Sequence, residues 1–240
     1  MSVVRLLRLA GTPILQQLKI EEALLRADAQ NWLVVNDGSS IPAIVMGISG
    51  KAKELIKIPQ AQEAKIDVIK RFSGGGTVVV DENTIFSTVI MNSSALPHVE
   101  CYPRPVMKWT EALLRPVFSP YGNFRLACHD YVYDENKFGG NAQAITKQRW
   151  LHHTSFLWDF QEARMALLQH PARVPAYRKG REHLKFLMRL KDIMPLRDAF
   201  LGQMEQALTS HGFHLQEASM EEVNAILPKD HLRSTKLIDL

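Results

Sequence analysis

Three consecutive glycines at positions 74–76 constrain the fold more than any other segment of the chain, because they interrupt two stretches of strand-forming residues. Residues 68–72 and 77–80 are rich in β-branched and apolar side chains, which predicts a strand, a glycine loop and a second strand. Without side chains, the loop can close tightly and leave backbone N–H groups uncovered for an anionic ligand. A bent hairpin or a bulge is the alternative, and the loop matches neither GxxxxGK[ST] nor GxGxxG.

A second motif, Lys137-Phe138-Gly139-Gly140-Asn141-Ala142-Gln143, follows in a region of predicted strands. Most lysines are ordinary surface residues, but the glycines and the amide after this one indicate a close approach to a ligand. Just before the glycine loop, Arg71 offers planar N–H donors and Ser73 offers a hydroxyl, which suit a carboxylate or a phosphate. A glycine loop and a lysine from a separate strand therefore predict a site that neutralises an anionic ligand.

Length and composition limit the classes to which the chain can belong. Its 240 residues suit one domain with at most a small appendage, and 46% hydrophobic and 22% charged residues are typical of a globular protein. No apolar run approaches the roughly 18 residues of a membrane span. Cys101 and Cys128 form no CxxC pair, so we expect a reducing compartment and no zinc framework.

Basic residues are concentrated in one stretch, although the net charge is only +4. Residues 164–191, called here the basic stripe, contain eight Lys or Arg and one acid, Glu182. Such a stripe attracts phosphates, nucleic acid or an acidic protein, and a solvated face is an equally good explanation. Periodic structure begins almost at the N-terminus, so we expect no cleavable leader and a cytoplasmic protein, with mitochondrion or plastid as the alternative.

The pattern of elements predicts an α+β fold with a mostly antiparallel central sheet flanked by helices. The strands are predicted at 3–10, 32–36, 43–48, 68–72, 77–80, 85–91, 124–127, 131–133, 142–147 and 150–159. A helix is predicted after Thr12, as a capping residue, and Pro13, with Glu21 and Glu22 on its polar side. Further helices are predicted within 51–64, 105–118, 160–169, 183–190, 196–210 and 219–227. We expect one main domain over residues 1–190 and a helical extension, residues 191–240, packed on it.

Residues 70–81, Lys-Arg-Phe-Ser-Gly-Gly-Gly-Thr-Val-Val-Val-Asp, resemble the RRxSGGGxVxxD stretch of lipoate-protein ligases, within the wider family of biotin and lipoate ligases and octanoyl transferases. The lysine motif resembles that family's Ser/Gly-Gly-Asn-Ala-Gln run, with Gly139 in the place of a serine hydroxyl that could contact a ligand. The likeness spans about residues 5–190 and implies the biotin/lipoate ligase catalytic-domain fold and Lys137 as the catalytic residue. The implied lipoate- and ATP-binding residues are Arg71, Ser73, Gly74, Gly75, Gly76, Thr77, Asp130, Gly140, Asn141, Ala142, His153 and Lys179, and no metal-ligating residue is implied.

Residues 151–157 resemble the family's LxHHGxLL strand and contain two adjacent histidines, His152 and His153. Neighbouring residues of a strand point to opposite faces, so we expect one histidine in the core and the other in the acyl or nucleotide site, with no shared metal. Asp130 is implied to position the nucleotide or Mg²⁺, and residues 171–190 resemble the basic segment that closes over the nucleotide.

The resemblance implies an ATP-dependent ligase. The carboxylate of lipoic acid would attack the α-phosphate of Mg-ATP to give lipoyl-AMP, and the amine of an acceptor lysine would then displace AMP. The implied cofactors are ATP and Mg²⁺, and the implied partners are acidic apo lipoyl domains of a 2-oxoacid dehydrogenase E2 or of the glycine cleavage H protein. The basic stripe would steer their docking. We expect a monomer with no nucleic-acid or membrane partner.

Two other functions stay open. Octanoyl transfer through a thioester needs a cysteine near Lys137, and Cys128 is the nearer candidate. We also expect the chain to lack the full accessory C-terminal domain that larger lipoate ligases carry. It could therefore depend on a partner subunit for adenylation, transfer preformed lipoyl-AMP, or only bind the acyl group. The choice between lipoate and octanoate is open as well.

Overall fold

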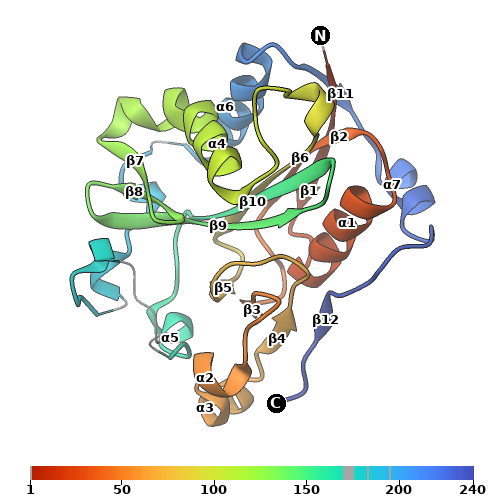
Figure 1. Cartoon of the computed structure of the whole chain (residues 1–240). Helices are drawn as coiled ribbons and strands as arrows, with labels where there is room; N and C mark the ends of the chain where they lie inside the picture. Colours follow the sequence, from red (N-terminus) through yellow and green to blue (C-terminus); the bar gives the residue numbers. More distant parts are fainter. Residues whose placement is uncertain (1, 170–175, 183, 195) are drawn as a thin grey trace.

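The computed structural model describes residues 2–169, 176–182, 184–194 and 196–240, which form two β-sheets with helices on both sides of the larger sheet (Figure 1). In these residues the larger sheet has eight strands and the smaller has four. The spatial order of the larger sheet is β11 (His214–Glu217), β1 (Val3–Ala10), β2 (Asn31–Asp37), β6 (Thr84–Asn92), β10 (Arg149–Leu157), β9 (Asn136–Ile145), β8 (Asp130–Tyr133) and β7 (Phe124–Ala127). The order of the smaller sheet is β12 (Lys236–Leu237), β4 (Asp67–Lys70), β3 (Ala43–Met46) and β5 (Val78–Val80).

The predicted α+β class is confirmed, and the central sheet is mostly antiparallel. β1 runs parallel to both β2 and β11, whereas each neighbouring pair from β2 to β7 is antiparallel. The helices are α1 (Ile14–Arg26), α2 (Ala52–Leu55), α3 (Ile58–Glu63), α4 (Pro103–Phe118), α5 (Glu162–Met165), α6 (Arg197–Ser210) and α7 (Met220–Ile226). Among the described residues, none of these helices is both long enough and apolar enough to cross a bilayer.

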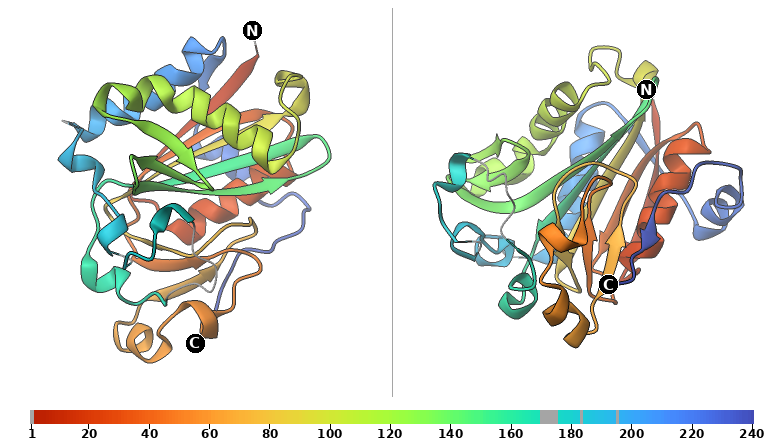
Figure 2. Two further views of the ribbon diagram at one scale, coloured as in Figure 1. Left: turned by 60° about the vertical axis from the view of Figure 1, so that its left-hand side comes forward. Right: turned by 60° about the horizontal axis from the view of Figure 1, so that its bottom comes forward.

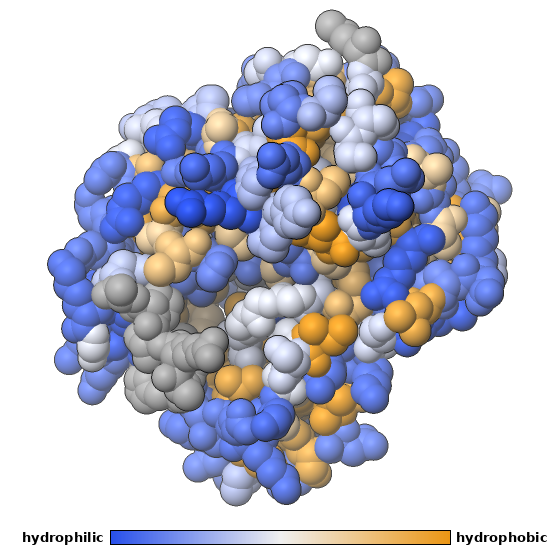
Figure 3. All heavy atoms as spheres, in the orientation of Figure 1, coloured by the Kyte–Doolittle hydropathy of each residue, from blue (hydrophilic) through white to orange (hydrophobic). Residues whose placement is uncertain are grey.

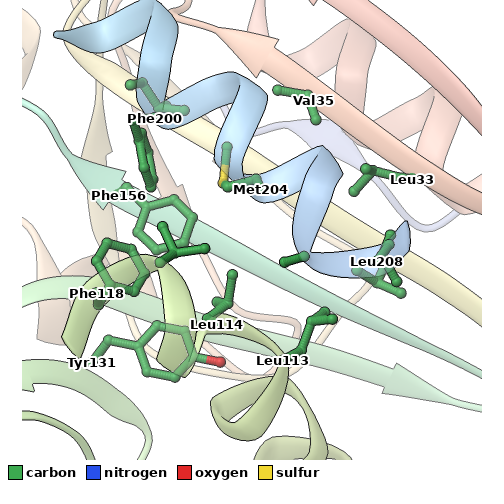
Figure 4. Close-up of a cluster of buried hydrophobic side chains, with 14 of the residues drawn as sticks. Leu33, Val35, Leu113, Leu114, Phe118, Tyr131, Phe156, Phe200, Met204 and Leu208 are labelled. Atoms are coloured by element: carbon green, nitrogen blue, oxygen red, sulfur yellow. The ribbon is translucent and has the colours of Figure 1, made fainter. Parts of the chain in front are cut away.

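Helices cover both faces of the larger sheet. Figure 2 shows α4 on one side of the strands and α1 on the other. The two faces arise because successive strand residues point in opposite directions, so that Leu33 packs toward α4 and α6, whereas Trp32 packs toward α1 and α7. On the α4 side, Phe118 meets Phe156 and Phe200 in the cluster drawn in Figure 4.

The smaller sheet packs below α1 and the larger sheet, and it carries the glycine loop between β4 and β5. Ile14 and Leu18 of α1 share an apolar cluster with Val45, Ile69 and Phe86, which come from both sheets. This packing fixes the position of the glycine loop relative to β9 and β10, whose residues include the lysine motif and the two histidines.

The start of α1 differs from the prediction. Thr12 makes no side-chain capping bond; instead, the backbone N–H of Ile14 donates to Ser39 Oγ at 3.1 Å, from a loop distant in sequence. Glu21 and Glu22, predicted on a polar side, are both buried. The helical spacing was correct, but α1 is enclosed by the sheets on one side and by residues 234–235 on the other.

Two predicted helices are present only as short helical turns. Over 160–169, only α5 is helical, and after it Leu168 bridges Ile56 while the N–H of Gln169 donates to Leu55 O. Over 183–190, residue 183 lies outside the described residues, and the rest contains the 3₁₀ turn η4 (Leu184–Phe186) and the first residue of η5 (Leu190–Asp192). Between these two turns the chain pairs with β9, where the N–H of Met188 donates to Lys137 O at 2.9 Å.

Residues 191–240 contain the two predicted helices, as α6 and α7, and also two strands that the prediction missed. β11 extends the larger sheet beside β1, and β12 extends the smaller sheet beside β4. The carboxylate of buried Glu22 accepts the backbone N–H groups of Ser234 and Thr235 at 2.8 and 3.0 Å, which leads the chain across α1 to β12. The extension therefore completes both sheets.

Candidate active site

A cavity of about 510 Å³ lies between the two sheets, within the usual range for a small-molecule site. The glycine loop, β9, the start of α4 and parts of residues 168–186 all contribute to its lining. Figure 3 shows the face of Figure 1, where hydrophobic residues gather around the middle and hydrophilic ones dominate the outline. Part of the lining is apolar and includes Val45, Val80 and Phe86; another part contains the charged residues Asp130 and Lys137.

The structure brings both sequence motifs into this one cavity. The predicted site residues that line it are Arg71, Gly74, Gly75, Gly76, Thr77, Asp130, Lys137, Gly140, Asn141, Ala142 and His153. Ser73 and Lys179 are described but lie outside the lining. The motifs also touch directly, because the N–H of Gly74 donates to Gln143 O at 3.0 Å.

Arg71 braces the glycine loop from inside. The residue is only 4% exposed, and Nη2 donates to Gly74 O and Gly76 O, both at 2.8 Å. Nε donates to Ser73 Oγ at 3.1 Å, so the hydroxyl predicted to meet a ligand is occupied within the loop. Burial lowers the pKa of Arg71 to about 10, which still leaves it charged near neutral pH. Much of the donor capacity that the sequence suggested for a ligand is thus used to shape the loop.

Gly75 is the conformational centre of the loop. Its φ of +104° lies in the region that favours glycine, and a Cβ placed there would come within 2.7 Å of Arg71 Nη2 and 3.1 Å of Asn141 O. A Cβ on Gly76 would meet no atom within 4 Å. Gly75 and Gly76 therefore differ in role: Gly75 allows the loop to pack, whereas Gly76 borders open space.

Lys137 is held at the cavity wall by a short ion pair. Its Nζ lies 2.8 Å from Asp130 Oδ1, and the two side chains are 20% and 13% exposed. The register of β8 and β9 shifts next to this pair, so that Asp130 lies opposite Gly140. A side chain at Gly140 would come within 3.3 Å of Lys137 Nζ, which shows that this glycine leaves room for the ammonium group.

Gly139 has a packing role. A Cβ there would meet Tyr131 at 3.2 Å and Phe156 at 3.4 Å, both in the aromatic core below α4. The expectation that a lost serine hydroxyl weakens a ligand contact was therefore wrong, since a side chain at this position faces away from Lys137.

Two residues of the cavity lining, Thr77 and Asn141, each have a buried polar side-chain atom without a hydrogen-bond partner among the described residues, Oγ1 and Nδ2 respectively. The amide of Asn141 lies on the α4 side of the sheet, where its Oδ1 accepts from Thr154 Oγ1 at 2.7 Å and lies 3.2 Å from His152 Nε2. Because buried polar groups are nearly always paired, the unpartnered hydroxyl of Thr77 indicates that the cavity suits a polar ligand.

The two histidines point to opposite faces of the sheet, as alternation along a strand predicts. His152 lies under α4 near Thr110, and burial, with His153 nearby, lowers its pKa to about 3, so it is neutral. His153 lines the cavity, and its Nδ1 lies 2.9 Å from Oε2 of Glu21. Sequence reasoning missed Glu21, although its spacing from Ile14 and Leu18 places it on the buried side of α1.

Lys179 points away from the cavity and pairs with Glu135 at 2.5 Å. Its neighbour Arg178 lines the cavity instead, with its guanidinium 4.5 Å from the ring centroid of Phe186. The basic stripe therefore contributes to the site through a different residue from the one predicted. Residues 171–175 and 183 of the predicted nucleotide-covering segment lie outside the described residues.

Cations of the basic stripe are largely engaged with nearby groups. The pairs in the described part of the stripe are Arg164 with Asp81 and Glu82, Lys179 with Glu135, Lys185 with Glu182, Arg189 with Asp159 and Glu162, and Lys191 with Asp159. Arg181 donates to Asn136 Oδ1 at 3.0 Å. These bonds fasten the described part of the stripe to the strands and loops below, whereas Lys179 and Lys185 stay mostly exposed.

Comparisons with known proteins agree with this arrangement, in which a glycine loop and a lysine line one cavity that has an apolar part and a polar part. Residues 13–213 match the model of the lipoyl protein ligase A/B catalytic domain. The chain belongs to the lipoate-protein ligase family.

Curated relatives include one protein of Plasmodium falciparum and one of Mycoplasma pneumoniae. The inactive lipoate–protein ligase 2 of Plasmodium falciparum is 30% identical over 188 residues, which cover 62% of this chain and 47% of the relative. The probable lipoate-protein ligase A of Mycoplasma pneumoniae is 25% identical over 190 residues, which cover 75% and 54%. This chain thus spans about half the length of the curated relatives it matches.

Solved structures share the fold over nearly the whole chain. A lipoate-protein ligase A bound with ATP has a TM-score of 0.73 and 17% identity, covering 94% of this chain and 92% of that one. A putative lipoate protein ligase of T. acidophilum with bound lipoic acid has a TM-score of 0.75 and 16% identity, covering 95% and 93%. A bi-partite lipoate protein ligase of Thermoplasma acidophilum has a TM-score of 0.76 and 18% identity, covering 95% and 91%. The predicted catalytic-domain fold is confirmed.

Proposed function

We propose that the chain is a lipoate-protein ligase that activates lipoate with ATP and transfers the lipoyl group to a lysine of an apo lipoyl domain. The observation that carries this proposal is the meeting of Lys137, Asp130 and the glycine loop in a cavity that also has an apolar part. An acyl chain would lie against residues such as Val80 and Phe86, and its carboxylate would face Lys137. The solved relatives with bound ATP and with bound lipoic acid support this choice of substrates.

The residues of the cavity suit both chemical steps. The lysine ammonium has three N–H donors, and Asp130 uses one of them, which leaves two for the acyl carboxylate and the α-phosphate. In the first step, a carboxylate oxygen bonds to the α-phosphorus and pyrophosphate leaves. In the second, an acceptor amine bonds to the acyl carbon and AMP leaves. The fixed positive charge of Lys137 would stabilise the negative charge that develops in each step.

Thr77 would orient the polar part of the substrate. Its hydroxyl has no partner among the described residues and belongs to a residue of the cavity lining, so a ligand oxygen could accept from it. Mg²⁺ would come with the nucleotide. In the described lining, Asp130 is the one carboxylate, and its oxygens already bond Lys137 and Tyr177, so the phosphates would supply most of the ligands of the ion.

Adenylation could depend on a second subunit. The chain spans about half of its curated relatives, one of which is named inactive, and one solved relative is described as bi-partite together with its E2 lipoyl domain. An acidic lipoyl domain remains the acceptor that we propose, and its acceptor lysine would have to reach Lys137 through the mouth of the cavity.

Octanoyl transfer is the second candidate function, and one observation favours keeping it. Cys128 is exposed and lines the cavity together with Asp130 and Lys137. A thiol at this wall could accept an acyl group as a thioester before the group passes to an amine. Replacing Cys128 with Ser separates the functions, because a ligase keeps its activity and a thioester-forming transferase loses it.

The decisive experiment uses three acceptor reactions read by intact mass. The first contains Mg-ATP, lipoate and an apo lipoyl domain; the second contains synthetic lipoyl-AMP in place of ATP and lipoate; the third contains octanoyl acyl carrier protein. Modification in the first establishes a complete ligase. Modification in the second alone means that adenylation needs a partner, and modification in the third alone means acyl transfer. Lys137→Ala should lose activity in the reaction that works, with unchanged circular dichroism.

A further inference from the structure

Asp130 is shared between two residues that approach it from different parts of the chain. Oδ1 lies 2.8 Å from Lys137 Nζ, and Oδ2 accepts the hydroxyl of Tyr177 at 2.6 Å. Both carboxylate oxygens are thus engaged, and the carboxylate cannot rotate without breaking one of the two bonds. Tyr177 thereby links the basic stripe to the ion pair of the proposed catalytic lysine.

The backbone around Tyr177 is itself anchored. Tyr177 lies in the 3₁₀ turn η3 (Ala176–Arg178). Arg181, four residues later, donates to Asn136 Oδ1 at 3.0 Å and to Glu135 O at 2.6 Å, at the turn between β8 and β9. The ring of Tyr177 lies edge-on to Phe186 of the cavity lining, with centroids 6.3 Å apart. The hydroxyl of Tyr177 is therefore held beside Asp130 by a segment that is itself bonded to the turn between β8 and β9.

We propose that Tyr177 is a positioning residue, which fixes the Asp130 carboxylate and through it the ammonium of Lys137. Lysine carries its charge on a flexible four-carbon stem, so an unanchored ammonium would occupy many positions along the cavity wall. An anchored ammonium is already in place when the substrate binds. This positioning raises the rate of the reaction rather than the affinity for the substrate. The effect on the reaction rests on the proposed ligase function, whereas the effect on Lys137 does not.

The phenol of Tyr177 is suited to a permanent donor role. Burial and the neighbouring Asp130 carboxylate raise its pKa, so the hydroxyl keeps its proton at every pH at which the protein is folded and active. Its bond to Asp130 is charge-assisted, which makes it shorter and stronger than a bond between neutral groups.

The test compares Tyr177→Phe with Tyr133→Phe, a control that also removes one phenol hydroxyl. Tyr133 donates to Phe118 O in the core and does not line the cavity. In whichever acceptor reaction is active, Tyr177→Phe should lower kcat by about tenfold and leave KM for the acyl substrate within about twofold, since only the placement of Lys137 changes. Tyr133→Phe should leave both constants unchanged, whatever it does to Tm. Adding Tyr177→Phe to Asp130→Asn should cause little further loss, because both changes break the same chain of bonds.

A second measurement needs no ligase activity. Acetylation by sulfo-N-hydroxysuccinimide acetate is followed at Lys137 by peptide mass spectrometry, with exposed Lys108 as the reference in the same sample. Tyr177→Phe and Asp130→Asn should each raise the relative rate at Lys137 severalfold, because the lysine side chain is then no longer fixed against the cavity wall and reaches the reagent more often. An unchanged labelling rate in Tyr177→Phe would overturn the proposal, even if Asp130→Asn labels faster. Faster labelling in a protein without acceptor modification would support the contact and reject the ligase function. Circular dichroism checks that both variants fold.

Discussion

Replacing Gly75 with alanine tests whether the glycine loop is packed as described. The new methyl group would lie 2.7 Å from Arg71 Nη2 and 3.1 Å from Asn141 O, in a backbone conformation with φ of +104°. The conformation costs about 1–2 kcal/mol for a residue with a side chain. If Nη2 gives up one of its 2.8 Å bonds to Gly74 O or Gly76 O, another ~1.5–3 kcal/mol is lost. We therefore expect the free energy of unfolding to fall by roughly 2.5–5 kcal/mol.

Thermal unfolding and urea titration measure this change, and for a chain of this length Tm should fall by on the order of 10 °C. Gly76→Ala is the matched control, since its methyl group would meet no atom within 4 Å, and its stability should stay within about 0.5 kcal/mol of the wild type. Equal Tm values for Gly75→Ala and Gly76→Ala would refute the account of Arg71 as an internal brace. A valine at Gly75 should likewise act by breaking the loop, because its side chain would first meet Arg71.

Three further predictions concern acid sensitivity, nucleotide binding and the residues after α7. His152 is neutral when folded, with a pKa lowered by burial to about 3, so below about pH 6.5 the unfolded chain gains a proton that the folded chain does not. Urea titrations between about pH 6.5 and 4.5 should show stability falling by ~1.4 kcal/mol per pH unit from this group, and a slope just as steep in His152→Gln would contradict it. Lys179→Ala should change ATP affinity by less than about twofold in calorimetry, because the lysine faces Glu135; a tenfold loss would place it in the nucleotide site. Glu22→Ala should lower the free energy of unfolding by ~2–4 kcal/mol and speed proteolysis near Thr235, because it removes the carboxylate that accepts two backbone N–H groups there. Unchanged protease resistance would show that these two bonds do not hold the segment in place.

The sequence supported the fold class through local patterns, and the meeting of the two motifs through their resemblance to the lipoate-protein ligases. Alternation of apolar residues located most strands, and Lys137 stood out because glycines and an amide follow it in the chain. Alternation along β10 also separated the faces of His152 and His153. These features depend on neighbours in the chain, so they are visible without a structure.

The other features depend on contacts between distant residues. Arg71 was predicted to meet a ligand, but its donors turn inward to the carbonyls of its own loop. Glu21 was placed on a polar side because nothing nearby in the sequence shows that His153 covers it. The strand β11, His-Leu-Gln-Glu, has little apolar character and forms because β1 offers an open edge.

Each sheet receives one edge strand, β11 or β12, from the last part of the chain to be translated. This order has a consequence for folding during synthesis on the ribosome. β4, which leads into the glycine loop, cannot pair with β12 until residue 237 has been made, because Ile69 pairs with Leu237. At ~5–20 residues per second, translation of the intervening chain takes on the order of 10–30 s. During that time β1 and β4 each present an unpaired edge to neighbouring chains. We expect the site to mature only after β11 and β12 have emerged, and newly made protein to need protection from aggregation until then.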